Sequence, residues 1–216
     1  MHPQTINQGS NGTCGAAVLM KMLAEISPSD LVNAAVSLFD NGTYKQWGWT
    51  ISDDMKRCSK QQLNEIGINE VEAMIQTGII NGNNKYLQYS ANTDNQGNED
   101  FLNKKYDGLK SFMWHTYIRD FMSSIYPEKF IERTTSPSYE TIKLIDYAKE
   151  FVIAAVDCIG SNFVNSLVPT HYVQINSVGG KDSKDNFIIE YWNYGTMDKS
   201  YNNSHTYINY LYRIRR

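Results

Sequence analysis

One cysteine of the chain follows a short polar segment that is rich in small residues. The segment Asn7–Cys14 reads NQGSNGTC, and an apolar run with helical spacing begins at Cys14. A thiol becomes a strong nucleophile when it loses its proton, and the free N–H groups and dipole of a helix N-terminus stabilise the thiolate. Gln8 is spaced to donate an amide N–H to an oxyanion, and Gly12 and Gly15 would let a substrate backbone approach closely. This pattern predicts acyl transfer through the thiol of Cys14.

The other interpretation of Cys14 is a small core residue on a helix, which is the commonest fate of a free cysteine. Cys58 lacks glycine neighbours and Cys158 ends an apolar run, so both are predicted to be structural. The sequence has no CxxC pair and no Cys/His spacing typical of zinc. We therefore expect no disulfide framework, no metal and no cofactor.

A thiol nucleophile needs a general base, and His171 is the best candidate. It begins the segment HYVQINSV, a predicted strand on which its side chain would share a face with Val173 and Ile175. The other three histidines lie in a terminus, in the middle of a predicted helix, and after a polar loop: His2, His115 and His205.

A second predicted strand, FIIEYWN, supplies a partner for this histidine. Pairing Ser177 opposite Phe187 in an antiparallel hairpin places His171 opposite Asn193 on the same face. The amide oxygen of Asn193 would then accept a hydrogen bond from the ring and orient it. In this register Glu190 points to the other face, and Asp198 lies beyond the strand.

Both segments resemble papain-like cysteine peptidases: Asn7–Cys14 is similar to their active-site segment, and HYVQINSV, a turn and FIIEYWNYGT resemble their histidine hairpin. The resemblance implies that Gln8 is the oxyanion glutamine, Cys14 the nucleophile, His171 the base and Asn193 the residue that orients it. It also implies a papain-like α+β fold, in which the nucleophile helix packs against a C-terminal antiparallel sheet. Trp192 joins Gly12 and Gly15 as an expected substrate contact.

The chain departs from the family pattern at several positions. Gly15 stands where the family has an aromatic residue, Asn11 replaces a disulfide cysteine of secreted members, and Tyr-Gly follows Asn193 instead of Ser-Trp-Gly. These differences favour bacterial papain-like or C39-like peptidases, or papain-fold effector toxins, over lysosomal enzymes.

The elements that must position these residues are helices first and strands later, which is typical of α+β rather than alternating β/α organisation. We expect one catalytic domain over 1–216, with a helical and loop insertion at about 40–150. Helices are predicted at 14–26, from SPSD at 27–30 to Gly42, at 109–126 and at 137–150. Two shorter helices are predicted between 59 and 80, followed by a long loop at 81–100. The predicted strands are 151–158, 171–178, 187–193 and 205–214.

Composition excludes some function classes. The formal net charge is −3, so nothing indicates binding to nucleic acid or to a membrane, and the RIRR run at 213–216 is expected to be a solvated terminus. No apolar run approaches the ~20 residues of a membrane helix. The N-terminus carries no apolar signal segment, which predicts a cytoplasmic protein or one exported by a dedicated bacterial secretion system.

The sequence leaves three functions open. The first is a cysteine peptidase acting on a protein or peptide substrate; the second is a glutamine deamidase or transglutaminase-like toxin; the third is a catalytically inactive binding module. An unguarded broad peptidase would damage its host, so we expect narrow specificity or an inhibitory (immunity) protein. Trp47, Trp49 and Trp114, beside the 81–100 loop, are predicted to form one side of a recognition cleft.

Overall fold

The computed structural model describes residues 2–9, 12–58, 60–84, 89, 113–159, 162–165, 171–202 and 206–216. The chain divides into two compact units, Met1–Trp114 and His115–Arg216. Helices dominate the first unit and an antiparallel sheet dominates the second, so the predicted α+β class is confirmed. The boundary between the units lies inside the segment predicted as an insertion, and the single catalytic domain stays a prediction.

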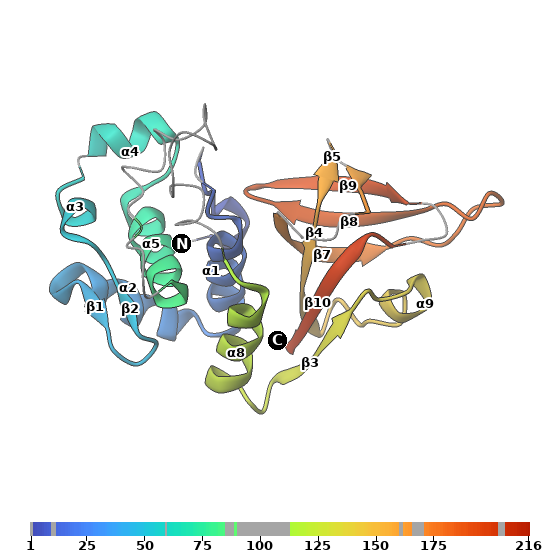
Figure 1. Ribbon diagram of the computed structural model, residues 1–216, viewed down its shortest axis with the longest axis horizontal. Helices are drawn as coiled ribbons and strands as arrows, with labels where there is room; N and C mark the ends of the chain where they lie inside the picture. The colour runs from blue at the N-terminus through green and yellow to red at the C-terminus, as the bar shows by residue number, and fades with distance from the viewer. Residues whose placement is uncertain are drawn as a thin grey trace. The chain divides into compact units, whose positions relative to one another are not determined.

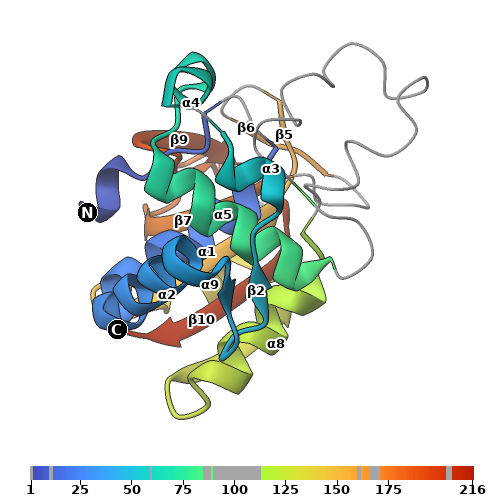
Figure 2. The same ribbon diagram turned by 90° about the vertical axis from the view of Figure 1, so that its left-hand side faces the viewer.

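Three helices that pack together form the first unit (Figures 1 and 2). α1 spans Cys14–Ile26, α2 spans Pro28–Asn41 and α5 spans Glu70–Asn83. Pro28 begins α2 and Gly42 ends it with a positive φ of 68°, as the sequence predicted. The smaller elements are η1 (Pro3–Thr5), β1 (Thr43–Tyr44), β2 (Trp49–Thr50), α3 (Asp53–Lys56) and α4 (Lys60–Ile66). Among the described residues, no helix has both the length and the apolar character needed to cross a bilayer.

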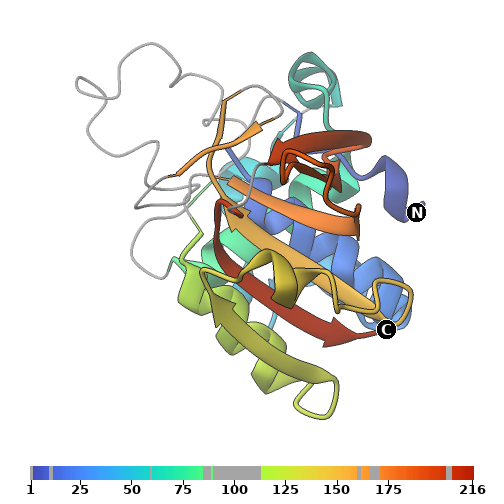
Figure 3. The same ribbon diagram turned by 90° about the vertical axis from the view of Figure 1, so that its right-hand side faces the viewer.

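A six-stranded antiparallel sheet forms most of the second unit, with the strand order β3-β10-β4-β7-β8-β9 (Figures 1 and 3). Its strands are β3 (Phe130–Thr135), β4 (Glu150–Val156), β7 (His171–Val178), β8 (Phe187–Asn193), β9 (Thr196–Asn202) and β10 (Ile208–Arg215). The unit also contains α8 (His115–Ile125), α9 (Tyr139–Ile142) and a small pair of strands, β5 (Cys158–Ile159) and β6 (Asn162–Phe163). The strands predicted at 171–178 and 187–193 have the predicted bounds.

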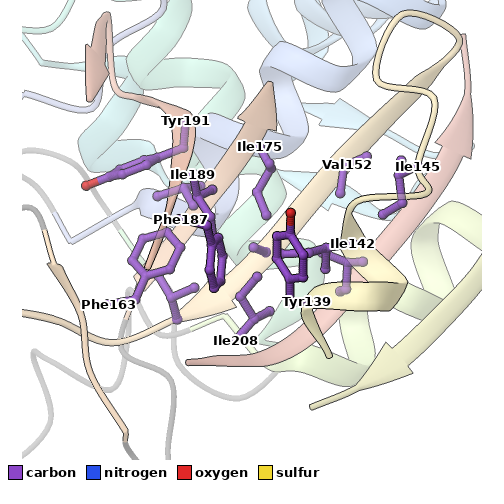
Figure 4. Packing of buried hydrophobic residues seen from close by; sticks show 14 residues of the cluster. Tyr139, Ile142, Ile145, Val152, Phe163, Ile175, Phe187, Ile189, Tyr191 and Ile208 are labelled. Atoms are coloured by element: carbon purple, nitrogen blue, oxygen red, sulfur yellow. The ribbon is translucent and has the colours of Figure 1, made fainter. Parts of the chain in front are cut away.

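The core of the second unit lies where α9 and β6 contribute apolar side chains to the sheet (Figure 4). The ring of Tyr139 packs on that of Phe187 with centroids 4.6 Å apart, and the Phe163 ring lies 5.0 Å from that of Tyr191. Alternate residues of β7 and β8 enter this core, which fixes the face to which each strand position belongs.

Several predicted elements differ from the structure. The helix predicted at 137–150 is only the four residues of α9, because the chain turns after Ile142 and the apolar Leu144 is 79% exposed. The helix predicted at 109–126 begins at His115; positions 109–112 of it lie outside the described residues, as does most of the predicted 81–100 loop. β3 and β9 were not predicted.

The RIRR segment is not a solvated tail. Arg213, Ile214 and Arg215 belong to β10, and Ile214 is fully buried. The Arg213 guanidinium donates to both carboxylate oxygens of Glu150, at 2.7 and 2.9 Å, and to Glu132 at 2.7 Å. These carboxylates raise the pKa of Arg213, mainly through the hydrogen bonds with Glu150. Arg213 of β10 thus forms ion pairs with Glu150 of β4 and with Glu132 of β3, the two neighbouring strands of the sheet.

Candidate active site

The predicted nucleophile is the first residue of a long helix. Cys14 begins α1 and is half-buried, and the helix has no acidic residue in its first turn. The first-turn N–H groups of an α-helix lack partners within the helix, and with the helix dipole they favour a negative charge at this end. Ala16, Ala17 and Val18 are fully buried, so packing holds the start of the helix in place. Cys14 thus lies at the end of α1 where the helix dipole favours a negative charge.

The loop before Cys14 is fixed by one buried glutamine of α5. The Thr13 hydroxyl donates to Oε1 of Gln76 at 2.5 Å, and Nε2 of Gln76 donates to the Asn7 carbonyl at 2.7 Å. Gln76 is 1% exposed, its hydrogen bond with Thr13 is buried and the one with Asn7 is partly buried. The Asn7 side chain accepts from the Gly9 N–H at 3.0 Å, and Gly9 has a positive φ of 63° that suits this tight turn. Sequence reasoning missed Gln76, because nothing in the order of residues brings position 76 to position 7.

A buried carboxyl strengthens the same attachment. Burial raises the pKa of Glu72, although hydrogen bonds from Asn69 and from the backbone of Asn7 act in the opposite direction. Glu72 lies one helical turn from Gln76 on α5, so the two side chains bind the loop from one helix face.

Gln8, the predicted oxyanion donor, lies on this fixed loop. Its Oε1 atom is buried and makes no hydrogen bond to any part of the chain that the structure describes. A buried amide oxygen without a partner costs about 1–3 kcal/mol. Buried polar atoms of Thr134, Gln174 and Asn202 share this condition, so it does not by itself distinguish Gln8, and its role as oxyanion donor stays a prediction.

In the second unit, His171 and Asn193 are hydrogen-bonded, as the sequence predicted. Nε2 of His171 lies 3.0 Å from Oδ1 of Asn193. Nδ2 of Asn193 donates to Asp198 at 2.9 Å. Because the carboxylate of Asp198 requires a donor, the amide oxygen of Asn193 faces the ring and accepts from Nε2–H. Nε2 therefore carries a proton in this arrangement.

The assumed strand register is wrong, but His171 and Asn193 are in contact nevertheless, for a geometric reason. Gln174 pairs with Trp192 rather than with Glu190, a shift of two residues from the assumed register. A β-bulge between Ile175 and Ser177 shifts the outer part of the hairpin by one more. Since side chains alternate with a period of two, the two-residue shift keeps His171 and Asn193 on one face. They are diagonal neighbours instead of directly opposite.

Tyr194 is a third neighbour of the imidazole, and sequence reasoning missed it. Its hydroxyl lies 3.1 Å from Nδ1 of His171 and donates to the Tyr172 carbonyl at 2.7 Å. The Tyr-Gly pair after Asn193 was a usable signal, because two residues with Gly second are typical of a hairpin turn that leads into another strand. That strand is β9, which carries Asp198.

Of the three residues predicted to contact a substrate, Gly15 and Trp192 are buried and Gly12 is exposed. A Cβ atom on Gly15 would lie 2.7 Å from Sδ of Met113, so packing alone requires glycine there. Trp192 is 1% exposed and its ring packs on edge against Tyr194 at 5.7 Å. Contacts of these three residues with a substrate stay predictions.

Two of the tryptophans expected to line a recognition cleft are core residues. Trp47 and Trp49 are 8% and 0% exposed, and their rings meet with centroids 4.7 Å apart. Trp114 is 55% exposed, and among these three it alone presents a large surface.

The remaining cysteines and histidines show no comparable setting. Cys58 and Cys158 are half-buried, and burial raises the pKa of the Cys58 thiol. Burial, followed by the charges of Arg133 and Arg119, lowers the pKa of His115, whose ring stacks on Tyr210. His2 is exposed, and His205 lies outside the described residues. Within the described ranges, no group of three or more His, Cys, Asp or Glu side chains is placed to hold a metal ion.

Comparisons of the chain with models of protein families, with curated proteins and with solved structures found no match. Gln8 and Cys14 belong to the first unit, and His171 and Asn193 belong to the second.

Proposed function

We propose that this chain is a thiol-dependent hydrolase that cleaves amide bonds in protein substrates, with Cys14 as nucleophile and His171 as base. The proposal includes a papain-like arrangement, in which the nucleophile helix α1 and the histidine hairpin of β7 and β8 act together. Asn193 orients the imidazole and Gln8 donates to the oxyanion.

The observation that carries the proposal is the hydrogen-bonded chain His171–Asn193–Asp198, with distances of 3.0 and 2.9 Å. An amide that is itself held by a carboxylate fixes both the tautomer and the direction of the ring, which is what a general base requires. The position of Cys14 at the start of α1 supports the same chemistry independently, because a helix N-terminus favours the thiolate.

The reaction follows from these groups. His171 takes the proton of the Cys14 thiol at Nδ1, and the thiolate attacks the substrate carbonyl carbon. The amide of Gln8 and the backbone N–H of Cys14 donate to the oxyanion of the tetrahedral intermediate. The intermediate expels the amine, which takes the proton from Nδ1, and leaves an acyl-thioester on Cys14. Water, deprotonated by His171, then hydrolyses the thioester and regenerates the thiol.

Narrow specificity belongs to the same proposal. A thiol hydrolase of this kind, working in a bacterial cell or as an exported effector toxin, must spare the proteins of its own host. Restricted substrates or a cognate inhibitory protein would achieve this.

Mass spectrometry of candidate protein substrates tests the proposal. Substrates are incubated with the wild-type chain, with Cys14→Ala and with Cys58→Ala as the matched cysteine control. New peptide termini with the wild type and Cys58→Ala, absent with Cys14→Ala, are expected. A mass gain of about one dalton, the difference between an amide and an acid, would instead establish glutamine deamidation. Unchanged substrates would support a catalytically inactive binding module.

A further inference from the structure

Four of the eight large apolar side chains that are exposed in the described part of the chain gather on one face of the first unit. Val32, Val36 and Phe39 of α2 are 59%, 54% and 80% exposed, and Val71 of α5 is 40% exposed. Their spacing of four and three residues places the α2 side chains in one stripe, which is about 10 Å long. Single apolar residues at a surface need no explanation, but a gathered set marks an interaction site.

A groove of about 380 Å³ opens beside Phe39, at the C-terminal end of this stripe. It lies among α2, α3, α4 and α5 (Figure 2). Six of its nine lining residues carry large apolar side chains: Phe39, Ile51, Met55, Leu63, Val71 and Met74. Two of the six are methionines, whose flexible side chains adapt to the shape of an inserted group. The stripe and the groove together are called the α2–α5 surface below.

The extent of the α2–α5 surface favours a protein partner over a small molecule. A small ligand would fill the groove and leave the stripe in water, because Val32 lies two helical turns from Phe39. An amphipathic helix laid along α2 covers both parts, since its apolar residues also recur at intervals of three and four. One apolar side chain of such a helix enters the groove while others contact Val36 and Val32.

Two carboxylates flank this surface. Glu70 lines the groove, and Asp40 is next to Phe39 on α2. Both residues are exposed, and within the described ranges neither lies at ion-pair distance from a basic group. The C-terminal end of α2, where Asp40 lies, is also the negative end of the helix dipole. The potential at this end of the surface is therefore negative.

The basic groups nearest to this surface are paired or lie elsewhere. Lys56, the only basic residue that lines the groove, is paired with Asp53 at 3.3 Å. Lys45 lines a separate hollow with Ser37 and Asn41, on the other flank of α2. A second copy of this chain would bring the same two flanking carboxylates against the surface, whereas a partner with Lys or Arg beside its apolar residues would pair with them.

We propose that the α2–α5 surface binds an amphipathic helix of a protein partner whose apolar residues are flanked by Lys or Arg. One large apolar side chain enters the groove, two others lie along the stripe, and a basic side chain pairs with Glu70 or Asp40. No residue of this surface takes part in the proposed chemistry, so the inference is independent of the proposed function.

Selection of peptides on the full chain tests the inference. A random library of peptides about 16 residues long, a little over four helical turns, is selected on the wild-type chain and counter-selected on Val36→Lys. Lysine suits an exposed helix position, so this variant should keep its fold, which circular dichroism checks. The enriched peptides are expected to carry apolar residues at intervals of three and four, and more Lys and Arg than Asp and Glu.

Fluorescence anisotropy of a synthetic enriched peptide then measures what each part of the surface contributes. Val32→Lys, which plays no part in the selection, should weaken binding about tenfold, as expected for an apolar contact in an interface. Glu70→Gln should weaken binding about threefold, and by less at high salt. Leu144→Lys is the matched control and should leave the affinity unchanged, because Leu144 is a 79% exposed apolar residue of the second unit.

Several results would overturn the inference. No enrichment of peptides over Val36→Lys, enriched peptides rich in Asp and Glu, or an equal loss of affinity in Leu144→Lys would each do so. Unchanged affinity in Val32→Lys would confine binding to the groove and refute a helix along α2. Analytical ultracentrifugation addresses the second copy, because a wild-type dimer that Val36→Lys dissociates would assign the surface to self-association instead.

Discussion

At the residue scale, the cysteines differ in the local field that acts on each thiol. Cys14 lies at the N-terminus of a 13-residue helix, where the dipole favours a negative charge. Burial instead raises the pKa of Cys58, which therefore holds less thiolate near neutral pH. The thiolate is the species that reacts with an alkylating reagent, so reactivity separates the two cysteines.

We expect brief alkylation with iodoacetamide near pH 7 to label Cys14 at least about tenfold faster than Cys58 or Cys158. Raising the pH should accelerate labelling of Cys58 more than that of Cys14, because the Cys58 thiolate forms only at higher pH. Peptide mass spectrometry of samples quenched over time measures all three rates. His171→Ala should slow labelling of Cys14 alone, and preferential labelling of another cysteine would remove Cys14 as the nucleophile.

At the element scale, hydrogen bonds from α5 hold the loop before Cys14 in place. Asn69 caps this helix by accepting from the Glu72 N–H at 2.9 Å, and Gln76 binds both ends of the loop, at Asn7 and Thr13. The position of Gln8 thus depends on a helix that follows it by about 60 residues in the chain. A substitution in α5 can therefore test how the loop is held.

Gln76→Ala should lower the free energy of unfolding by about 2–4 kcal/mol, because it removes the partner of the buried Thr13 hydroxyl and of the partly buried Asn7 carbonyl and opens a cavity. Urea denaturation followed by circular dichroism measures this change. Gln61→Ala, at an exposed position of α4, should change the same quantity by less than about 0.5 kcal/mol. Equal effects of the two substitutions would show that the Gln76 hydrogen bonds contribute little.

At the scale of the whole molecule, the candidate catalytic groups are divided between the two units, and each unit has its own packed interior. Trp47 and Trp49 belong to the interior of the first unit, so they contribute stability rather than a recognition surface. Under the proposed function, selectivity for substrates would then depend on exposed residues, of which Trp114 is an example. The proposed need to spare host proteins still predicts that few proteins are attacked.

Incubation of the wild-type chain with unfolded casein and with a whole-cell lysate measures this breadth. We expect a few discrete modified proteins in the lysate and little degradation of casein, with none of the changes in the Cys14→Ala control. Rapid and general degradation of both preparations would contradict narrow specificity.

The sequence by itself determined the elements whose causes are local. Hydrophobic spacing from Cys14 to Ile26 predicted α1 with its observed bounds, and Pro28 and Gly42 marked the two ends of α2. Alternation at 171–178 and 187–193 predicted β7 and β8 and placed His171 and Asn193 on one face. In each case the periodicity reports the conformation of the same few residues that carry it.

Tertiary structure alone decided the features that depend on contacts between distant segments. The bulge after Ile175 sets the register, and Gln76 reaches back to the loop before Cys14. A bulge and a single long-range hydrogen bond leave no periodic signal in the sequence. The segment 137–150 is the converse case: its spacing suits a helix, but the helical part ends at Ile142 and the chain turns before it enters β4 at Glu150. Sheet pairing and core burial outweigh local propensity wherever the two compete.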